Sequence, residues 1–209
     1  MSIDILKRYT NLSVLIDILV KKHFTLVDPN NWEDRNDVYC LDVYKEKIKL
    51  KTLLALCMTD APETFHHWKI YASGSCGVCI HFDEALLKEQ LENEIGITCS
   101  YVNYKYVKDI FDKFINISEL PFIKRKSYED ELEFRIIYAD KSKKKEFKNI
   151  DIDLKCITKI VASPWMHKSL FKSVKELIRG IEGCSNIEMT RSAVVDFSQW
   201  KNAIKKFEE

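Results

Sequence analysis

The chain has 209 residues, of which 46% are hydrophobic and 31% are charged, a composition that buries a full core without help from a metal or a partner. Its 33 Lys and Arg side chains balance 32 Asp and Glu side chains, so no overall charge attracts it to nucleic acid or to a membrane surface. We expect a single domain over residues 1–209, or two tightly packed lobes, with core motifs in 5–140 and further strand and helix elements in 150–209.

Neither a signal peptide nor a membrane span is expected. The apolar stretch from Leu12 to Val20 is short and is interrupted by Asp17, and no segment reaches the roughly eighteen apolar residues that a span needs. Seven cysteines scattered through apolar contexts fit reduced thiols better than a disulfide framework. These features predict a cytoplasmic protein.

The first third of the chain predicts a strand, a helix and a second strand. Ile5–Tyr9 reads as a short strand, and the apolar residues of the segment 12–19 recur at helical spacing. Phe24–Val27 reads as the next strand. The segment 30–37 is expected to be a polar loop that carries one large aromatic residue, Trp32.

The middle of the chain alternates between strand and helix patterns. Short apolar runs and alternating segments indicate strands, and apolar residues three or four apart indicate helices. The predicted strands are Leu53–Met58, Gly77–Phe82 and Ile97–Tyr106, and the predicted helices are Glu63–Ala72, Asp83–Glu94 and Val107–Ile117.

Residues Tyr128–Ile137 read as a strand with one charged face. Side chains alternate along a strand, so Glu131, Glu133 and Arg135 would share one face and the apolar residues between them the other. Two like charges on one face repel unless water, a cation or a ligand lies against them. Either Arg135 compensates the glutamates on a solvated face, or the pair faces a positively charged ligand.

The C-terminal part completes an α+β fold, with mostly antiparallel or mixed sheets flanked by helices, because long helical crossovers do not follow every strand. Lys141–Lys148 reads as a Lys-rich hairpin or loop. The remaining predicted elements are one or two strands in Ile150–Ala162, a helix from Ser163 and Pro164 to Ile181, a strand around Ala193–Phe197 and a helix over Gln199–Phe207.

Several side chains have both a chemical and a structural interpretation. Arg8, in the first strand, would grip a phosphate or form an ordinary salt bridge. Trp68 and Tyr71 lie three residues apart and would form a wall that stacks on a planar ring, or part of the core. Cys76 and Cys79 form a Cys-x-x-Cys, which fits packing thiols better than a redox or zinc site because both lie at the start of a predicted strand.

Taken in order, these segments resemble the uncharacterised bacterial family called domain of unknown function 2971. The resemblance covers most of the first 140 residues, and the loop at residues 33–37 departs from the family pattern. The residues that carry it are Arg8-Tyr9-Thr10, the loop Trp32–Asp37, Leu56-Cys57-Met58-Thr59, Trp68 with Tyr71-Ala72, Gly77–Phe82 and Glu131-Leu132-Glu133-Phe134-Arg135.

The order of an arginine in the first strand, a hydroxyl in a later strand and a Glu-x-Glu is also similar to the pattern of ADP-ribosyltransferases. This resemblance implies that NAD is a substrate, with Arg8 at its phosphates and Thr59 as the hydroxyl. It implies that Glu133 contacts the nicotinamide ribose and that Glu131 is its catalytic partner. The implied fold is a split sheet.

The residue types suit that chemistry. Breaking the nicotinamide glycosidic bond builds positive charge on the ribose, which paired carboxylates stabilise, and Glu131 would deprotonate the acceptor. No metal is expected for this reaction. The remaining predicted cofactor-binding residues are Tyr9, Trp68 and Tyr71, as an aromatic wall, and Arg135.

Two other functions use the same residues. A nuclease would gather Mg²⁺ with Asp34, Asp37, Glu131 and Glu133. A non-enzymatic module would bind nucleic acid or an acidic protein through its Lys-rich segments, Lys141–Lys148 and Lys124-Arg125-Lys126. If the transferase interpretation holds, family analogy implies a bacterial toxin or anti-phage defence factor that modifies a nucleic acid or protein acceptor, with an antitoxin as a possible partner and no membrane.

Overall fold

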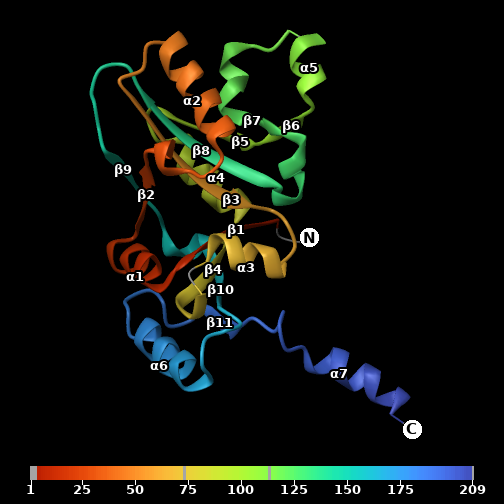
Figure 1. Ribbon diagram of the computed structural model, residues 1–209. Coiled ribbons are helices and arrows are strands. Elements are labelled where there is room, and N and C mark those ends of the chain that lie inside the picture. The colour runs from red at the N-terminus through yellow and green to blue at the C-terminus, as the bar shows by residue number, and fades with distance from the viewer. Residues whose placement is uncertain (1–3, 73, 113, 209) are drawn as a thin grey trace. The chain divides into compact units, whose positions relative to one another are not determined.

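The computed structural model describes residues 4–72, 74–112 and 114–208, and these residues divide into two compact units. Unit 1 comprises residues 1–6, 23–61 and 84–153, and unit 2 comprises residues 7–22, 62–83 and 154–209. Each unit therefore combines segments that lie far apart in the sequence. Helices and strands alternate in both, which confirms the predicted α+β class (Figure 1).

Unit 1 is built on a sheet in which neighbouring strands run antiparallel. The strand order is β9-β2-β3-β8-β5, and β6 and β7 form a separate parallel pair. The strands are β2 His23–Val27, β3 Thr52–Thr59, β5 Ile97–Tyr101, β6 Asn103–Lys105, β7 Ile123–Arg125, β8 Glu133–Asp140 and β9 Phe147–Asp151. The helices are α2 Arg35–Lys47, α4 Glu84–Glu92 and α5 Val107–Asp112, with 3-10 helices at Pro29–Asn31, Ile117–Phe122 and Lys126–Glu131.

Unit 2 contains a smaller mixed sheet. Strand β10 pairs antiparallel with β4 and parallel with β11, and β1, most of which belongs to this unit, lies next to β4. The strands are β1 Ile5–Asn11, β4 Gly77–Asp83, β10 Ile157–Ala162 and β11 Glu188–Arg191. The helices are α1 Leu12–Lys21, α3 Phe65–Tyr71, α6 Lys168–Arg179 and α7 Ser198–Ile204, with 3-10 helices at Gly74–Cys76, Leu154–Cys156 and Lys205–Phe207.

Helix α2 replaces the end of the predicted polar loop, so that prediction is wrong from Arg35 onward. Asp34 caps the helix by accepting a hydrogen bond from the Asn36 backbone N–H at 3.0 Å. Val38 and Leu41, three residues apart, are buried, and Leu41 packs against β3 and β8 residues. The third buried residue of the helix is Asp37, whose charge hid the amphipathic pattern in the sequence.

The strand predicted over Tyr128–Ile137 is wrong in its first half. Lys126–Glu131 forms a 3-10 helix, Leu132 has a left-handed backbone with φ of 40°, and β8 begins only at Glu133. Of the two alternatives for the charged face, the solvated one is wrong, because Glu133 and Arg135 are both buried. Glu133 and Arg135 therefore share a strand face, and Glu131 approaches them from the preceding turn.

The other shifts are local. The helix predicted from Ser163 begins only at Lys168, because buried Ser163 forms a turn and His167 caps the helix instead. The strand predicted near 193–197 lies at Glu188–Arg191, where it can pair with β10. The helix predicted over 107–117 ends at Asp112, and residue 113 lies outside the described residues.

None of the seven cysteines, all of which lie in the described residues, forms a disulfide, as predicted. No helix within the described residues is both long enough and apolar enough to span a bilayer.

A buried charge cluster with an adjoining pocket as the candidate functional site

The guanidinium of Arg135 is the centre of a buried charge cluster in unit 1. Its side chain is 0% exposed, and its Nε and Nη2 donate to the Glu133 carboxylate at 2.7 and 2.9 Å. Its Nη1 and Nη2 donate to the Asp37 carboxylate at 2.9 and 2.7 Å, and Nη1 also donates to the Pro121 carbonyl at 3.0 Å. All five guanidinium N–H groups are thereby satisfied.

Lys124 forms the second half of the cluster. Its ammonium lies 2.5 Å from Glu131 Oε2, 3.1 Å from Glu133 Oε2 and 3.8 Å from Asp37 Oδ2. The Glu133 side chain is 5% exposed, whereas that of Glu131 is 18% exposed. The cluster thus holds three carboxylates against two cations, with Glu131 at its accessible edge.

The cluster depends on elements from three parts of unit 1. Asp37 comes from the first turn of α2, Lys124 from β7, and Glu133 and Arg135 from β8. Trp32 covers the guanidinium, with its ring centroid 5.0 Å from Arg135 Cζ. A buried arginine needs such partners because an unpaired buried charge is very costly.

The protonation states follow from this arrangement. Burial alone would raise the pKa of Glu133, but Arg135 and Lys124 outweigh it and lower the pKa to about 2. Burial raises the pKa of Asp37, and Arg135 works against this shift. Burial disfavours the charged form of Lys124, but the Glu133 and Glu131 carboxylates raise its pKa above the ordinary value. Glu133 is therefore a carboxylate throughout the physiological pH range.

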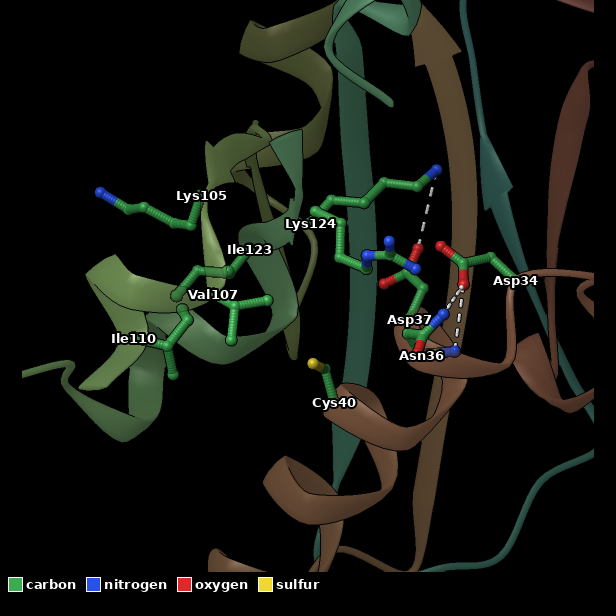
Figure 2. A pocket seen from close by; sticks show the side chains of 10 residues that line it. Asp34, Asn36, Asp37, Cys40, Lys105, Val107, Ile110, Ile123 and Lys124 are labelled. Carbon is green, nitrogen blue, oxygen red and sulfur yellow. Dashed lines mark hydrogen bonds and ion pairs between the residues drawn. The ribbon is translucent and has the colours of Figure 1, made fainter. Parts of the chain in front are cut away.

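A small pocket adjoins the cluster (Figure 2). Polar side chains of the α2 segment form one wall, and apolar side chains form the opposite one. Its volume is about 90 Å³, which admits a ring or a small group but not a whole dinucleotide, since drug-sized sites measure roughly 300–1,000 Å³. The lining residues are Asp34, Asn36, Asp37, Cys40, Lys105, Val107, Ile110, Ile123, Lys124 and Arg125.

The structure brings Thr59 to the predicted glutamates. Thr59 pairs with Glu133 across β3 and β8. Its hydroxyl donates to the backbone carbonyl of Glu131 at 2.5 Å and accepts from the Ala61 N–H at 2.8 Å. Four of the eight predicted site residues, Thr59, Glu131, Glu133 and Arg135, therefore lie together in unit 1.

The other four predicted residues, Arg8, Tyr9, Trp68 and Tyr71, lie in unit 2. The rings of Tyr9 and Trp68 meet edge to face with centroids 5.1 Å apart. Tyr9 also stacks on His67 at 5.4 Å, and His67 stacks on Tyr71 at 6.1 Å. Trp68 is 0% exposed and belongs to the core, whereas Tyr71 is 42% exposed and presents ring surface to solvent. Arg8 is half-buried.

Trp68 is further fixed by a hydrogen bond. Its Nε1–H donates to Glu63 Oε1 at 2.6 Å, and the Ser192 hydroxyl donates to the same oxygen. Cys79 packs in the same cluster, where burial raises its thiol pKa to about 12, so it is a protonated packing residue.

Sequence reasoning placed Asp37 and Lys124 only in the nuclease and binding-module alternatives and missed their pairing with the glutamates and Arg135. A signal was present, because an arginine between apolar strand residues needs an acidic partner from elsewhere in the chain. Nothing in the sequence identifies Asp37 as that partner among 32 acidic residues.

The geometry disfavours the nuclease alternative and removes one of the two basic segments from the binding-module alternative. Asp37 and Glu133 use both carboxylate oxygens on Arg135, and the described part of the chain contains no group of three His, Cys, Asp or Glu side chains placed to hold a metal. Of the basic segment 124–126, Lys124 is committed to the cluster and Lys126 pairs with Glu129.

Comparison with solved structures and with protein families identifies proteins to which this chain is similar. It is similar to two solved structures at a TM-score of 0.48 and 8% sequence identity. One is described as "Thermus sp. 2.9 DarT in complex with carba-NAD+", with 92% of this chain and 97% of that chain covered. The other is "Thermus sp. 2.9 DarT in complex with ADP-ribosylated ssDNA", with 90% and 94% covered.

The comparison with curated proteins gives no match. The family comparison does, and the matching segment includes the Trp68–Ala72, Gly77–Phe82 and Glu131–Arg135 motifs. Residues 67–151 match the family described as "Protein of unknown function (DUF2971)", which confirms the resemblance predicted from these motifs.

Proposed function

We propose that this protein is an NAD-using transferase of the ADP-ribosyltransferase type, with Glu131 as its catalytic carboxylate and Glu133 as the carboxylate that positions it. The observation that supports this function is the shared contact of both carboxylates with Lys124, which sets an accessible glutamate beside a buried one. With all five groups ionised, the cluster carries a net negative charge. Such a charge stabilises the cationic ribose that forms as nicotinamide leaves.

Burial separates the roles of the two glutamates. Glu131 is the carboxylate that can meet a ligand, whereas Glu133, with both oxygens engaged by Arg135, fixes Lys124 and hence Glu131. We assign Arg135 a positioning role in place of the predicted cofactor contact, because each of its N–H groups already has an acceptor. Arg8, Tyr9, Thr59 and Tyr71 keep their proposed assignment as cofactor-binding residues, whereas Trp68 is fully buried and is assigned to the core instead.

The reaction balances with these groups. The bond from ribose C1′ to the nicotinamide nitrogen breaks, and nicotinamide leaves with the electron pair. A nucleophile of a nucleic acid or protein acceptor, or water, bonds to C1′, and its proton passes to the Glu131 carboxylate.

The test is nicotinamide release from NAD by the purified protein, combined with calorimetric titration of NAD. We expect Glu131→Gln to lower release about 100-fold or more, the usual contribution of a general base, while NAD still binds. Glu129→Gln is the matched control, because Glu129 is an exposed acid of the same 3-10 helix. Arg8→Ala and Tyr71→Ala are expected to weaken NAD binding.

Absence of both NAD binding and nicotinamide release in the wild type at millimolar NAD would overturn the proposal. Equal loss of release in Glu129→Gln and Glu131→Gln would remove the role of Glu131. Thermal melting of each variant separates loss of activity from loss of fold.

We further propose a role as a bacterial toxin or anti-phage defence factor, because an unregulated enzyme that consumes NAD or modifies an acceptor harms its own cell. Induced expression of the wild type is expected to arrest bacterial growth, whereas Glu131→Gln should not. A neutralising antitoxin is then sought as a gene that restores growth. Arrest of equal strength by Glu131→Gln would contradict this role.

A further inference from the structure

Two Lys-rich segments lie side by side at one end of the unit 1 sheet. Residues 45–51 comprise the end of α2 and its connection to β3, and residues 140–146 comprise the last residue of β8 and its connection to β9. Thr52 pairs with Asp140 in the β3–β8 register, and the Lys51 N–H donates to the Asp140 carbonyl at 2.9 Å. The Thr52 hydroxyl donates to the Lys143 carbonyl at 2.7 Å and accepts from the Lys145 N–H at 2.8 Å.

These segments concentrate positive charge on a chain that is nearly neutral overall. They contain eight lysines and only three acids, whereas the whole chain has a formal net charge of +1. We call the eight residues the lysine patch. They are Lys45, Lys47, Lys49, Lys51, Lys141, Lys143, Lys144 and Lys145.

Six of the eight lysines are exposed; Lys45 and Lys145 are half-buried. Asp140, the first residue of the second segment, is an acid, but its carboxylate is engaged by hydrogen bonds within the loop. It accepts hydrogen bonds from the Ser142 hydroxyl and N–H, both at 2.7 Å, and from the Lys143 N–H at 3.1 Å. These bonds lower the Asp140 pKa, first through the Ser142 hydroxyl. The lysines of this loop are thus displayed on an ordered backbone, which reduces the entropy lost on binding.

The lysine patch is separate from the charge cluster. Thr59 pairs with Glu133 at one end of β3 and β8, and Thr52 pairs with Asp140 at the other. The seven residue steps from Thr52 to Thr59, at about 3.3 Å each, separate the two ends by roughly 23 Å. A ligand on the patch therefore needs no contact with Glu131 or Glu133.

The side chains present favour one kind of ligand. Lysine ammonium groups act as point charges that suit phosphates, and neither segment contains the arginine that usually reads guanine bidentately. No large hydrophobic residue within 45–51 or 140–146 is exposed, and exposed Phe147, the residue that follows, is by itself a small apolar anchor for a membrane surface. We propose that the lysine patch binds the phosphate backbone of nucleic acid without sequence preference.

The test is fluorescence anisotropy of a labelled duplex DNA of arbitrary sequence with the full-length protein in the absence of NAD. We expect binding that weakens steeply with salt, because each neutralised phosphate releases counterions. Charge reversal at Lys49, Lys51, Lys143 and Lys144 to Glu is expected to weaken binding at least 10-fold. It should also reduce the slope of log K against log salt by about one unit for each phosphate that is no longer neutralised. An unrelated duplex sequence should bind equally well.

The matched control reverses four exposed lysines of unit 2, Lys168, Lys201, Lys205 and Lys206, and changes the net charge by the same amount. We expect it to bind like the wild type. Equal weakening by both quadruple variants would reduce the effect to net charge and overturn the proposal. So would absence of wild-type binding at low salt, or tighter binding to anionic lipid vesicles than to DNA.

Two further variants keep the outcome decisive. The pair Lys143→Gln and Lys144→Gln tests the same surface if charge reversal unfolds the protein, and it should weaken binding in the same direction. Glu129→Gln, which lies outside both the lysine patch and the charge cluster, should bind DNA like the wild type. Because DNA binding is measured without NAD, failure of the transferase activity leaves this test standing, and failure of DNA binding leaves the transferase test standing.

Discussion

Arg135 Nη2 lies 2.7 Å from Asp37 Oδ2 although the two residues are 98 positions apart in the chain. This contact joins the first turn of α2 to the third residue of β8 in the interior of unit 1. Both side chains are almost fully buried, so each depends on the other for its charge.

Asp37→Asn is expected to lower the free energy of unfolding by about 3–5 kcal/mol, the usual effect of removing one partner of a buried ion pair. The remaining amide cannot neutralise the guanidinium. Urea denaturation measures the change, and Glu46→Gln, at an exposed position of the same helix, should stay within about 0.5 kcal/mol of the wild type. A loss below about 1 kcal/mol in Asp37→Asn would show that water or Glu133 suffices for Arg135.

Glu133 should make stability depend on acidic pH. Its pKa is about 2 in the folded protein against an ordinary value of 4.5, so the unfolded chain binds its proton first and stability falls as the pH drops through this window. Burial raises the pKa of Asp37, which acts in the opposite direction, so the informative quantity is the difference between variants. Urea midpoints between pH 6 and pH 3 should fall less steeply in Glu133→Gln than in the wild type; parallel curves would contradict the prediction.

His81 should confer a second pH dependence, in unit 2. Burial, reinforced by Lys7 and Lys159, lowers its pKa to about 4 from 6.5. Between these values the unfolded chain binds more protons, so stability rises with pH across this window. Hydrogen exchange of β4 and β10 amides at pH 5 and pH 7, corrected for intrinsic rates, should show weaker protection at pH 5. His81→Gln should abolish that difference, and its persistence would assign the effect to another group.

Leu132 occupies the left-handed region between the 3-10 helix and β8, with φ of 40°. A β-branched side chain fits this backbone poorly, so Leu132→Val is expected to destabilise the protein by about 1–2 kcal/mol. Leu132→Gly relieves the same strain, and it should stay close to the wild type because the side chain is largely exposed. Thermal melts compare the two. A glycine variant less stable than the valine variant would show that packing of Leu132 outweighs its backbone strain.

Most elements of the fold could be predicted from local patterns. The strands Gly77–Asp83 and Thr52–Thr59 are short apolar runs, and α1 follows the helical spacing of its apolar residues, with Asn11 accepting from the Val14 N–H at 2.9 Å. Helix α2 could not be predicted because one of its buried positions is a carboxylate. Its partner, Arg135, is identified only once distant segments are in contact.

In the candidate site too, the local pattern identifies the residues but not their long-range partners. The Glu-x-Glu-x-Arg pattern identified the charged residues, but alternation along a strand placed all three on one face and left open whether that face meets solvent or a ligand. A 3-10 helix ending at Glu131 and two partners from α2 and β7 change both their burial and their pairing. Local periodicity carries no information about such long-range charge compensation.

The interleaving of the two units limits how the protein can be made or dissected. Residues 1–83 contain pieces of both units and complete neither, because unit 1 extends to Asp153 and unit 2 resumes at Leu154. During synthesis, Asp37 leaves the ribosome well before Arg135, so its carboxylate stays solvated until Arg135 is available to pair with it. Truncated genes should therefore yield insoluble or degraded products instead of a working half, and a split into two co-expressed fragments has to leave both units' segments able to reassemble.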